Sequence, residues 1–244
     1  MSKLPHAPLV EVIFEIRWNS VDKASLDKFQ LLLGSMFSVL KEDFPNVVNL
    51  QPNSAIPINA FVGMPTHRFT SANGYPMYQL GPGILSVNMV NDGYIWESFL
   101  DTVKKVVSVF ERLSDLQGQK ITLALKYLDF FKFSFSEVDL KEYIKHNFHL
   151  SVESPYLNDR PSKTFSFATT YDVKVGKFSM SMNTGYNNVN GSQIEGIITE
   201  SNISQELNFG DLNSYISDKL PEAHEILGDF FKELTAGDFY EAFK

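Results

Sequence analysis

The feature that most constrains the fold of this chain is an order of predicted elements that occurs twice. In each occurrence, a long strand of alternating apolar and polar residues precedes an amphipathic helix, a series of short strands and a closing helix. The first occurrence covers about residues 8–116 and the second about residues 118–243. Because short strands separated by turns favour antiparallel hairpins, the pattern predicts an α+β protein. We expect two similar lobes, an N-terminal one over residues 1–116 and a C-terminal one over residues 117–244.

The opening strand of the N-terminal lobe is predicted over residues 9–18. One face of this strand is apolar, whereas the other carries Glu11, Glu15 and Arg17, which is typical of a strand with one buried face. Further along the lobe, apolar periodicity predicts helices, and frequent Pro and Gly allow only short strands. The predicted helices cover about residues 26–40 and 95–113, and the predicted short strands cover about residues 56–62, 67–71, 77–80 and 84–90.

The opening strand of the C-terminal lobe is predicted over residues 120–135. Asp129 interrupts its apolar, ring-rich row, and Lys126 lies on the opposite face. Since a buried carboxylate needs a hydrogen-bond partner, we expect Asp129 to bond to a neighbouring turn, with catalysis as the alternative role. The other predicted elements are a helix at about residues 140–147, strands at about residues 164–173, 177–183 and 193–201, and a closing helix at about residues 212–234 interrupted at Pro221.

The composition is that of an ordinary globular protein, with 43% hydrophobic and 20% charged residues. Because 21 residues are Phe and 10 are Tyr, we expect a core rich in aromatic rings, and an apolar C-terminal end that packs on its own lobe or, alternatively, on a second protomer. The absence of Cys excludes disulfides, thiol nucleophiles and thiolate-bound metals. A formal net charge of -8 disfavours nucleic acid as a partner, since binding to phosphates depends on clustered Lys and Arg.

No stretch of the sequence carries a catalytic or cofactor-binding motif. His146 and His149 would bind a metal only with a third ligand such as Glu142 or Glu153, and a capping or solvent-facing role is favoured. We therefore predict no catalytic residue, no metal site and no cofactor. The N-terminus lacks the segments of a secretory signal, and no apolar run approaches the roughly 20 residues that cross a bilayer. We accordingly predict a cytoplasmic protein without a membrane partner.

Three segments carry a family resemblance. Residues 4–16 read LPHAPLVEVIFEI, in which Pro, an apolar residue and a spacer precede a Glu that enters a strand; residues 85–88 (LSVN) run into residues 94–99 (YIWESF), and residues 123–129 read LALKYLD. The segments resemble a sporadically distributed family of uncharacterised bacterial and archaeal proteins, whose last motif tends to read Leu-Arg-Tyr-Ile-Asn. Lys126 and Asp129 replace that Arg and Asn, and lysine cannot form the bidentate contact of a guanidinium. The resemblance covers about the first 135 residues and implies no catalytic residues.

The repeated order of elements is also similar to the duplicated arrangement of the TATA-binding protein and, lobe by lobe, to folds that enclose apolar ligands. This similarity concerns topology and does not carry a function with it. The acidic balance of the chain is opposite to what a DNA-binding version needs.

The polar residues of the two opening strands are the candidate binding site. If these strands pair or face one another, their charged side chains would line a polar groove in which a ligand or a partner peptide docks. The alternative is an antiparallel sheet whose polar face meets water. The candidate residues are Glu11, Glu15, Arg17, Lys126 and Asp129.

These observations favour a cytoplasmic, non-enzymatic binding or interaction protein. The scattered distribution of the family that it resembles suits a component of an accessory or mobile gene system, with a protein partner or a homo-oligomer. The alternative is a carrier of an apolar small molecule, held in a cavity between sheet and helices and lined by Phe and Met. A further alternative is an enzyme with Asp129 or Glu11 as general base, which requires a carboxylate of raised pKa in a cleft.

Overall fold

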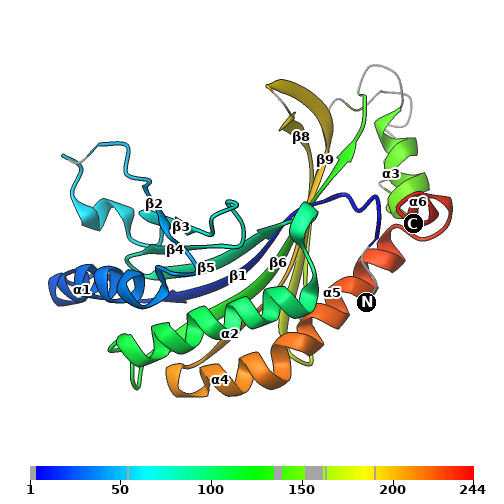
Figure 1. Cartoon of the computed structure of the whole chain (residues 1–244). Coiled ribbons are helices and arrows are strands. Elements are labelled where there is room, and N and C mark those ends of the chain that lie inside the picture. The colour runs from blue at the N-terminus through cyan, green and yellow to red at the C-terminus, as the bar shows by residue number, and fades with distance from the viewer. Residues whose placement is uncertain (1–3, 54, 135–138, 152–161, 163, 190) are drawn as a thin grey trace. The chain divides into compact units, whose positions relative to one another are not determined.

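The computed structural model describes residues 4–53, 55–134, 139–151, 162, 164–189 and 191–244. The fold is α+β, with helices beside a large antiparallel sheet (Figure 1). The strands are β1 (Leu9–Trp18), β2 (Asn46–Asn49), β3 (His67–Thr70), β4 (Met77–Gly81), β5 (Ile84–Val90), β6 (Lys120–Lys132), β7 (Ser166–Val173), β8 (Gly176–Val189) and β9 (Ser192–Asn208). The helices are α1 (Lys23–Leu40), α2 (Trp96–Leu113), α3 (Leu140–Phe148), α4 (Leu212–Ser214), α5 (Leu220–Leu234) and α6 (Asp238–Glu241), and the helical turns are η1 (Ile58–Phe61), η2 (Asn91–Gly93), η3 (Phe209–Asp211) and η4 (Tyr215–Lys219).

Within the described residues, the strands form a nine-stranded sheet in the order β2-β3-β4-β5-β1-β6-β9-β8-β7. Strands β2, β3, β4, β5 and β1 pair antiparallel in succession, as do β7 and β8. The first strand of the chain therefore lies inside the sheet, between β5 and β6. None of the helices in the described part of the chain is long and apolar enough to span a membrane.

The chain divides into two compact units, each made of segments that are not consecutive in sequence. The central unit comprises residues 11–125 and 204–221, and the terminal unit comprises residues 1–10, 126–203 and 222–244. Strands β6 and β9 each pass from one unit into the other. The division into similar lobes over residues 1–116 and 117–244 stays a prediction, as does their duplication.

The core of the central unit lies between one face of its sheet and the helices α1 and α2 (Figure 1). The Phe69 ring on β3 stacks on that of Tyr78 on β4 at 4.5 Å and contacts Phe37 on α1 at 5.7 Å. Trp18 on β1 contacts Phe110 on α2 at 5.1 Å. Because aromatic side chains bury large areas, these contacts hold both helices on the sheet.

The core of the terminal unit contains a cluster of aromatic rings around Phe131 on β6. Its ring lies 4.8 Å from Phe148, 5.5 Å from Phe239 and 6.0 Å from Phe243. The backbone N–H of His6 also donates to the carbonyl oxygen of Phe243 at 3.1 Å. The apolar C-terminal end therefore packs on its own chain, which confirms the first of the two expectations for it.

One sequence-based prediction at Pro57 is wrong, and one strand earlier in the chain was missed. Residues 56–62 do not form a strand, because Pro57 has no N–H to donate to a sheet and instead precedes the 3₁₀ turn η1 with φ of -60°. Ile56 is exposed, so the apolar residues of this segment did not mark a buried face. Strand β2 was not predicted, since its four residues are all exposed and show no alternation in burial.

The closing helical region is irregular before Pro221 and not at it. The π-helical turn η4 ends at Lys219, and α5 begins at Leu220. Pro221 is the second residue of α5 and follows this turn directly, so the irregular backbone lies next to the proline whose N–H is missing from the helix. The predicted interruption exists, but it lies one turn earlier in the chain.

Candidate functional site

The polar face of the central unit's sheet carries Glu11, Glu15 and Arg17, the candidate residues of β1. Helices α1 and α2 lie on the other, apolar side of this sheet (Figure 1). In the strand register, Glu15 lies opposite Ser86, Ser86 opposite Gln79, and Gln79 opposite Arg68. We call this surface the polar sheet face, and define it by Glu11, Glu15, Arg17, Arg68, Gln79, Ser86 and Asn88.

Glu15 and Arg17 form a bidentate ion pair on this face. The Arg17 Nε donates to Glu15 Oε1 at 2.6 Å and its Nη2 donates to Oε2 at 3.2 Å, while Nη1 donates to the Gly63 carbonyl oxygen at 3.0 Å. The two residues share a face because side chains two apart on a strand point the same way. Glu15 is only 8% exposed, and the guanidinium compensates for the burial of its charge.

Asn88 links the remaining groups of the polar sheet face. Its Nδ2 donates to Glu11 Oε1 at 3.0 Å, and its Oδ1 accepts from Ser86 Oγ at 2.7 Å and from Gln79 Nε2 at 3.5 Å. Asn88 and Ser86 are buried although they lie on the face away from α1 and α2. Hydrogen bonds between side chains therefore hold this part of the face in one arrangement.

Opposing effects act on the pKa of the Glu11 carboxyl. Burial raises the pKa of its carboxyl, and the hydrogen bond from Asn88 and the charge of Arg68 oppose that rise. Burial also raises the pKa of Tyr75, and the charge of Glu11 adds to this effect. The Arg68 Nε is buried and has no hydrogen-bond partner among the described residues. Glu11, Arg68 and Tyr75 are thus close enough to influence one another.

Asp129 is the carboxylate of the terminal unit that sequence analysis singled out. It is nearly fully buried, and burial raises its pKa to about 7 against the opposing effect of a hydrogen bond with Thr199. The expected partner in a turn is therefore wrong, because the hydrogen bond goes to β9, the neighbouring strand in the sheet. Lys126 is half-buried and lies on the other face of β6.

A second polar pair lies near Asp129 along β6. The Tyr127 hydroxyl and the His224 Nδ1 of α5 are hydrogen-bonded at 2.7 Å, and their rings lie 6.1 Å apart. His224 is buried. Sequence analysis gave it no role, because a single His on a helix carries no spacing signal.

The structure brings some of the candidate residues together, but the five candidates belong to two different units. Glu15 contacts Arg17, and Glu11 bonds to Asn88, all within the central unit. Lys126 and Asp129 belong to the terminal unit. A groove lined by residues of both strands stays a prediction. Ser86 and Asn88 were missed as site residues, although their alternation with Leu85 and Val87 signals a polar side of β5.

Of the histidines considered for a metal site, His146 is exposed in the last turn of α3 and His149 follows that helix. His149 occupies its C-cap position in the left-handed conformation, with φ of 53°, and its Nε2 lies 3.0 Å from the carbonyl oxygen of Ala236. Glu153, the possible further ligand, lies outside the described residues. In the described part of the chain, no three His, Asp or Glu residues are grouped so that they could hold a metal ion.

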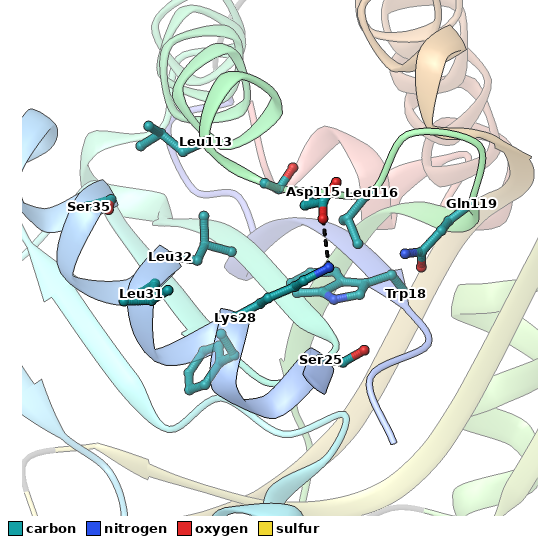
Figure 2. Close-up of a pocket in the computed structure, with 12 residues that line it drawn as sticks. Trp18, Ser25, Lys28, Leu31, Leu32, Ser35, Leu113, Asp115, Leu116 and Gln119 are labelled. Carbon is teal, nitrogen blue, oxygen red and sulfur yellow. Dashed lines mark hydrogen bonds and ion pairs between the residues drawn. The ribbon is translucent and has the colours of Figure 1, made fainter. Parts of the chain in front are cut away.

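A pocket of about 260 Å³ lies in the central unit between α1 and the segment that follows α2 (Figure 2). The Lys28 Nζ of α1 and the Asp115 Oδ2 of that segment form an ion pair of 2.6 Å across it. A hydrogen bond and the charge of Asp115 raise the pKa of Lys28, and Lys28 lowers the pKa of Asp115 in the same way. The lining residues are Trp18, Ser25, Lys28, Phe29, Leu31, Leu32, Ser35, Leu113, Ser114, Asp115, Leu116 and Gln119.

Comparison of the chain with protein-family models, with curated proteins and with solved structures found no match. The polar sheet face and the pocket are therefore the features of the molecule that bear on its function. The first offers a pre-organised set of donors and acceptors for a polar surface, and the second offers a lining in which apolar and polar side chains are equal in number.

Proposed function

We propose that this protein is a cytoplasmic, non-enzymatic interaction protein that binds a protein partner through the polar sheet face. The observation that supports this proposal is the ion pair of this face, in which the 45% exposed side chain of Arg17 is held in place by the buried carboxylate of Glu15. A polar surface that is held rigid before binding loses little conformational entropy when a partner docks.

The charges of this face favour protein over nucleic acid. Glu11 and Glu15 are balanced by Arg17 and Arg68, so the face presents both signs at close spacing. Interfaces between proteins combine such charges with hydrogen-bonding groups, whereas binding to phosphates needs a surplus of Lys and Arg. The net charge of -8 for the whole chain points the same way.

The arrangement of the carboxylates favours binding over catalysis. A general base must reach the substrate, and neither Glu11 nor Asp129 is among the residues that line the pocket beside α1. The side chain of Glu11 is instead bonded to Asn88. An interaction protein also suits the accessory or mobile gene system that the resemblance to a scattered family implies.

The test replaces Arg17 by Glu in a tagged chain expressed in its own host. Arg17→Glu places a third acid beside Glu15 and Glu11 and should abolish co-purification of the partner that the wild-type chain retains. The matched control is Lys104→Glu, which makes the same charge change at an exposed position of α2. Loss of the partner with both variants, or with neither, would contradict docking on the polar sheet face. A wild-type chain that is monomeric by native mass spectrometry and retains no partner would contradict the interaction function itself.

The second candidate function is that of a carrier for an apolar small molecule. One observation favours it, the pocket of about 260 Å³ beside α1. Its lining combines apolar side chains, among them Trp18, Leu32 and Leu116, with an equal number of polar ones. Binding of a small molecule here would change the NMR signal of the Trp18 indole, which lines the pocket, and would leave the signals of the polar sheet face unchanged.

A further inference from the structure

We infer that β7 pairs antiparallel with β7 of a second copy of this chain, so that the sheets of two copies join edge to edge. The pairing concerns an edge of the terminal unit and is separate from the polar sheet face, which lies in the central unit. It is supported by the position of β7 in the sheet, by the direction of its backbone groups, and by the match of its side chains across a two-fold axis.

Strand β7 is a long, exposed edge of the sheet in the described part of the chain. It lies at the end of the strand order and pairs with β8 on one side. Its eight residues contain no Pro and no Lys, two residues that commonly protect a sheet edge from pairing with another strand. Tyr171 is 58% exposed, and the even-numbered residues from 166 to 172 are all exposed. Strand β2, at the other end of the order, has only four residues.

The direction of the backbone groups of β7 follows from its ladder with β8. The N–H of Thr184 donates to the carbonyl oxygen of Phe165 at 3.0 Å, and the register with β8 runs without interruption over residues 166–173. Because backbone groups point alternately to the two sides of an antiparallel strand, the odd-numbered residues of β7 bond to β8. The N–H and C=O groups that point to the open edge therefore belong to Ser166, Ala168, Thr170 and Asp172.

These outward-pointing groups select one register for two copies of β7. Hydrogen-bonded pairs must join outward-pointing residues of both copies. The largest number forms when Ser166 faces Asp172 of the second copy and Ala168 faces Thr170. Because the two-fold axis repeats both pairs, this register gives about eight backbone hydrogen bonds, two for each pair. A register moved by two residues in either direction loses one of the pairs.

The side chains of β7 match one another in this register. Tyr171 lies opposite Phe178, whose ring is 4.7 Å from that of Phe230 on α5, so Tyr171 is on the side of that helix. Phe167 and Thr169 share this side. Across the two-fold axis, Phe167 faces Tyr171 of the second copy, and Thr169 faces Thr169. Side chains approach most closely in such pairs without backbone hydrogen bonds, so the aromatic pair covers the exposed Tyr171 ring.

A second copy is the occupant because one strand supplies both halves of the pairing. Asp172 is the single charged residue of β7 and faces Ser166 of the other copy, so no like charges meet. A two-fold pair also closes on itself and leaves no open edge at β7. An interface of one strand pair is small, so we expect a dimer that dissociates on dilution with a Kd of about 1–100 µM.

Sedimentation equilibrium of the full chain from about 1 to 300 µM measures this dimer. Ala168→Lys combined with Thr170→Lys places ammonium groups opposite one another and should raise the Kd at least about 100-fold. Glu at the same two positions should have the same effect. A 1:1 mixture of the Lys and Glu variants should form a heterodimer, which also shows that both are folded. Gln30→Lys combined with Ser38→Lys is the matched control, because it adds the same charges at exposed positions of α1.

Single cysteines test the register, since the wild-type chain contains no Cys. Thr169 faces Thr169 of the second copy in a pair without backbone hydrogen bonds. The Cα atoms of such a pair lie about 4.5 Å apart, within the range that a disulfide spans. Thr169→Cys should therefore form a covalent dimer when diamide is added as oxidant. Thr170→Cys is the control and should not, because Thr170 faces Ala168 of the second copy.

Several results would overturn the pairing of β7. A wild-type chain that stays monomeric at about 300 µM does not pair in this way. A dimer that persists in the Lys variant uses another surface, and a dimer that the α1 control also loses is not specific to β7. A covalent dimer from Thr170→Cys and none from Thr169→Cys would show that the register is wrong. If native mass spectrometry finds a different protein on the wild-type chain that the Lys variant loses, a foreign strand and not a second copy occupies the edge.

Discussion

Two carboxylates on long alternating strands, Glu15 of β1 and Asp129 of β6, lie in opposite surroundings. Glu15 lies on the polar sheet face and is held by the guanidinium of Arg17 at 2.6 Å. Asp129 lies in the same row as Phe131, bonds to the neutral hydroxyl of Thr199, and has a pKa of about 7. Both side chains are buried. The guanidinium compensates for the burial of the Glu15 charge, whereas the surroundings of Asp129 favour its neutral, protonated form.

The difference shows that burial alone does not decide the state of a polar group. An opposite charge on the same strand face stabilises the charged form, whereas an apolar row with a single hydroxyl destabilises it. Glu15 therefore adds a fixed charge to the polar sheet face. Asp129 instead makes the stability of the terminal unit depend on pH.

The largest expected effect on the free energy of unfolding comes from removing an aromatic ring from the core of either unit. Phe131→Ala should lower the free energy of unfolding by about 3–5 kcal/mol, and Phe69→Ala by a similar amount, because each removes a buried ring that contacts other rings. Chemical denaturation followed by circular dichroism measures both. Leu31→Ala is the control, since Leu31 is exposed and its loss should change little. An equally small effect of Phe131→Ala would mean that the aromatic cluster of the terminal unit is not formed.

The next effect concerns the ionisation of Asp129. Its pKa of about 7 in the folded state lies above the 3.8 of an unfolded chain, so the folded state binds a proton that the unfolded state releases. Stability should therefore fall as pH rises from about 4 to 7. Asp129→Asn, which stays neutral, should be more stable than the wild type by a few kcal/mol at pH 8, with little advantage at pH 4.

Urea denaturation at several pH values measures this dependence. Asp172→Asn, at an exposed position of the same unit, is the control and should follow the wild type. If Asp129→Asn were less stable than the wild type at pH 8, the ionised carboxylate would be a stabilising group and the contrast with Glu15 would fail.

A smaller effect is expected for the ion pair of the polar sheet face. Arg17→Met should destabilise the protein by about 1 kcal/mol, because it removes the guanidinium that donates two hydrogen bonds to the buried Glu15. The Arg17 side chain is 45% exposed, so water screens part of the interaction. In a double-mutant cycle with Glu15→Gln, the two changes should not be additive. Additive changes would show that the pair contributes nothing beyond its separate residues.

The smallest effect is expected for ion pairs at the surface. Lys120 pairs with Glu206 in the central unit and Lys174 with Glu222 in the terminal unit, both at 2.7 Å. Lys120→Gln and Lys174→Gln should leave the denaturation midpoint unchanged within error, since exposed pairs are screened by water and salt. A clear loss with either variant would require a packing role for that lysine.

Local sequence patterns predicted many of the helices and strands. They predicted few of the contacts that surround the candidate site. Strand β1 lies where alternation predicted it, over residues 9–18, and α2 begins within one residue of its predicted start. The partners of the candidate residues were not predictable in this way. Glu11 bonds to Asn88, which is 77 residues away, and no local period connects them. The pocket is likewise built from β1, α1 and the segment after α2.

The amino-acid sequence by itself determined most of the longer helices and strands of this protein, because the repeat of apolar side chains selects strand or helix within a few residues. It also determined which residues share a face, among them Glu15 with Arg17. Only the tertiary structure decided which faces are covered and which polar groups meet, as in the pairing of Tyr127 with His224 over 97 residues. The reason is that burial and pairing depend on neighbours brought together by folding, and these set the charge state of Asp129 and leave the hydroxyl of Ser114 without a partner among the described residues.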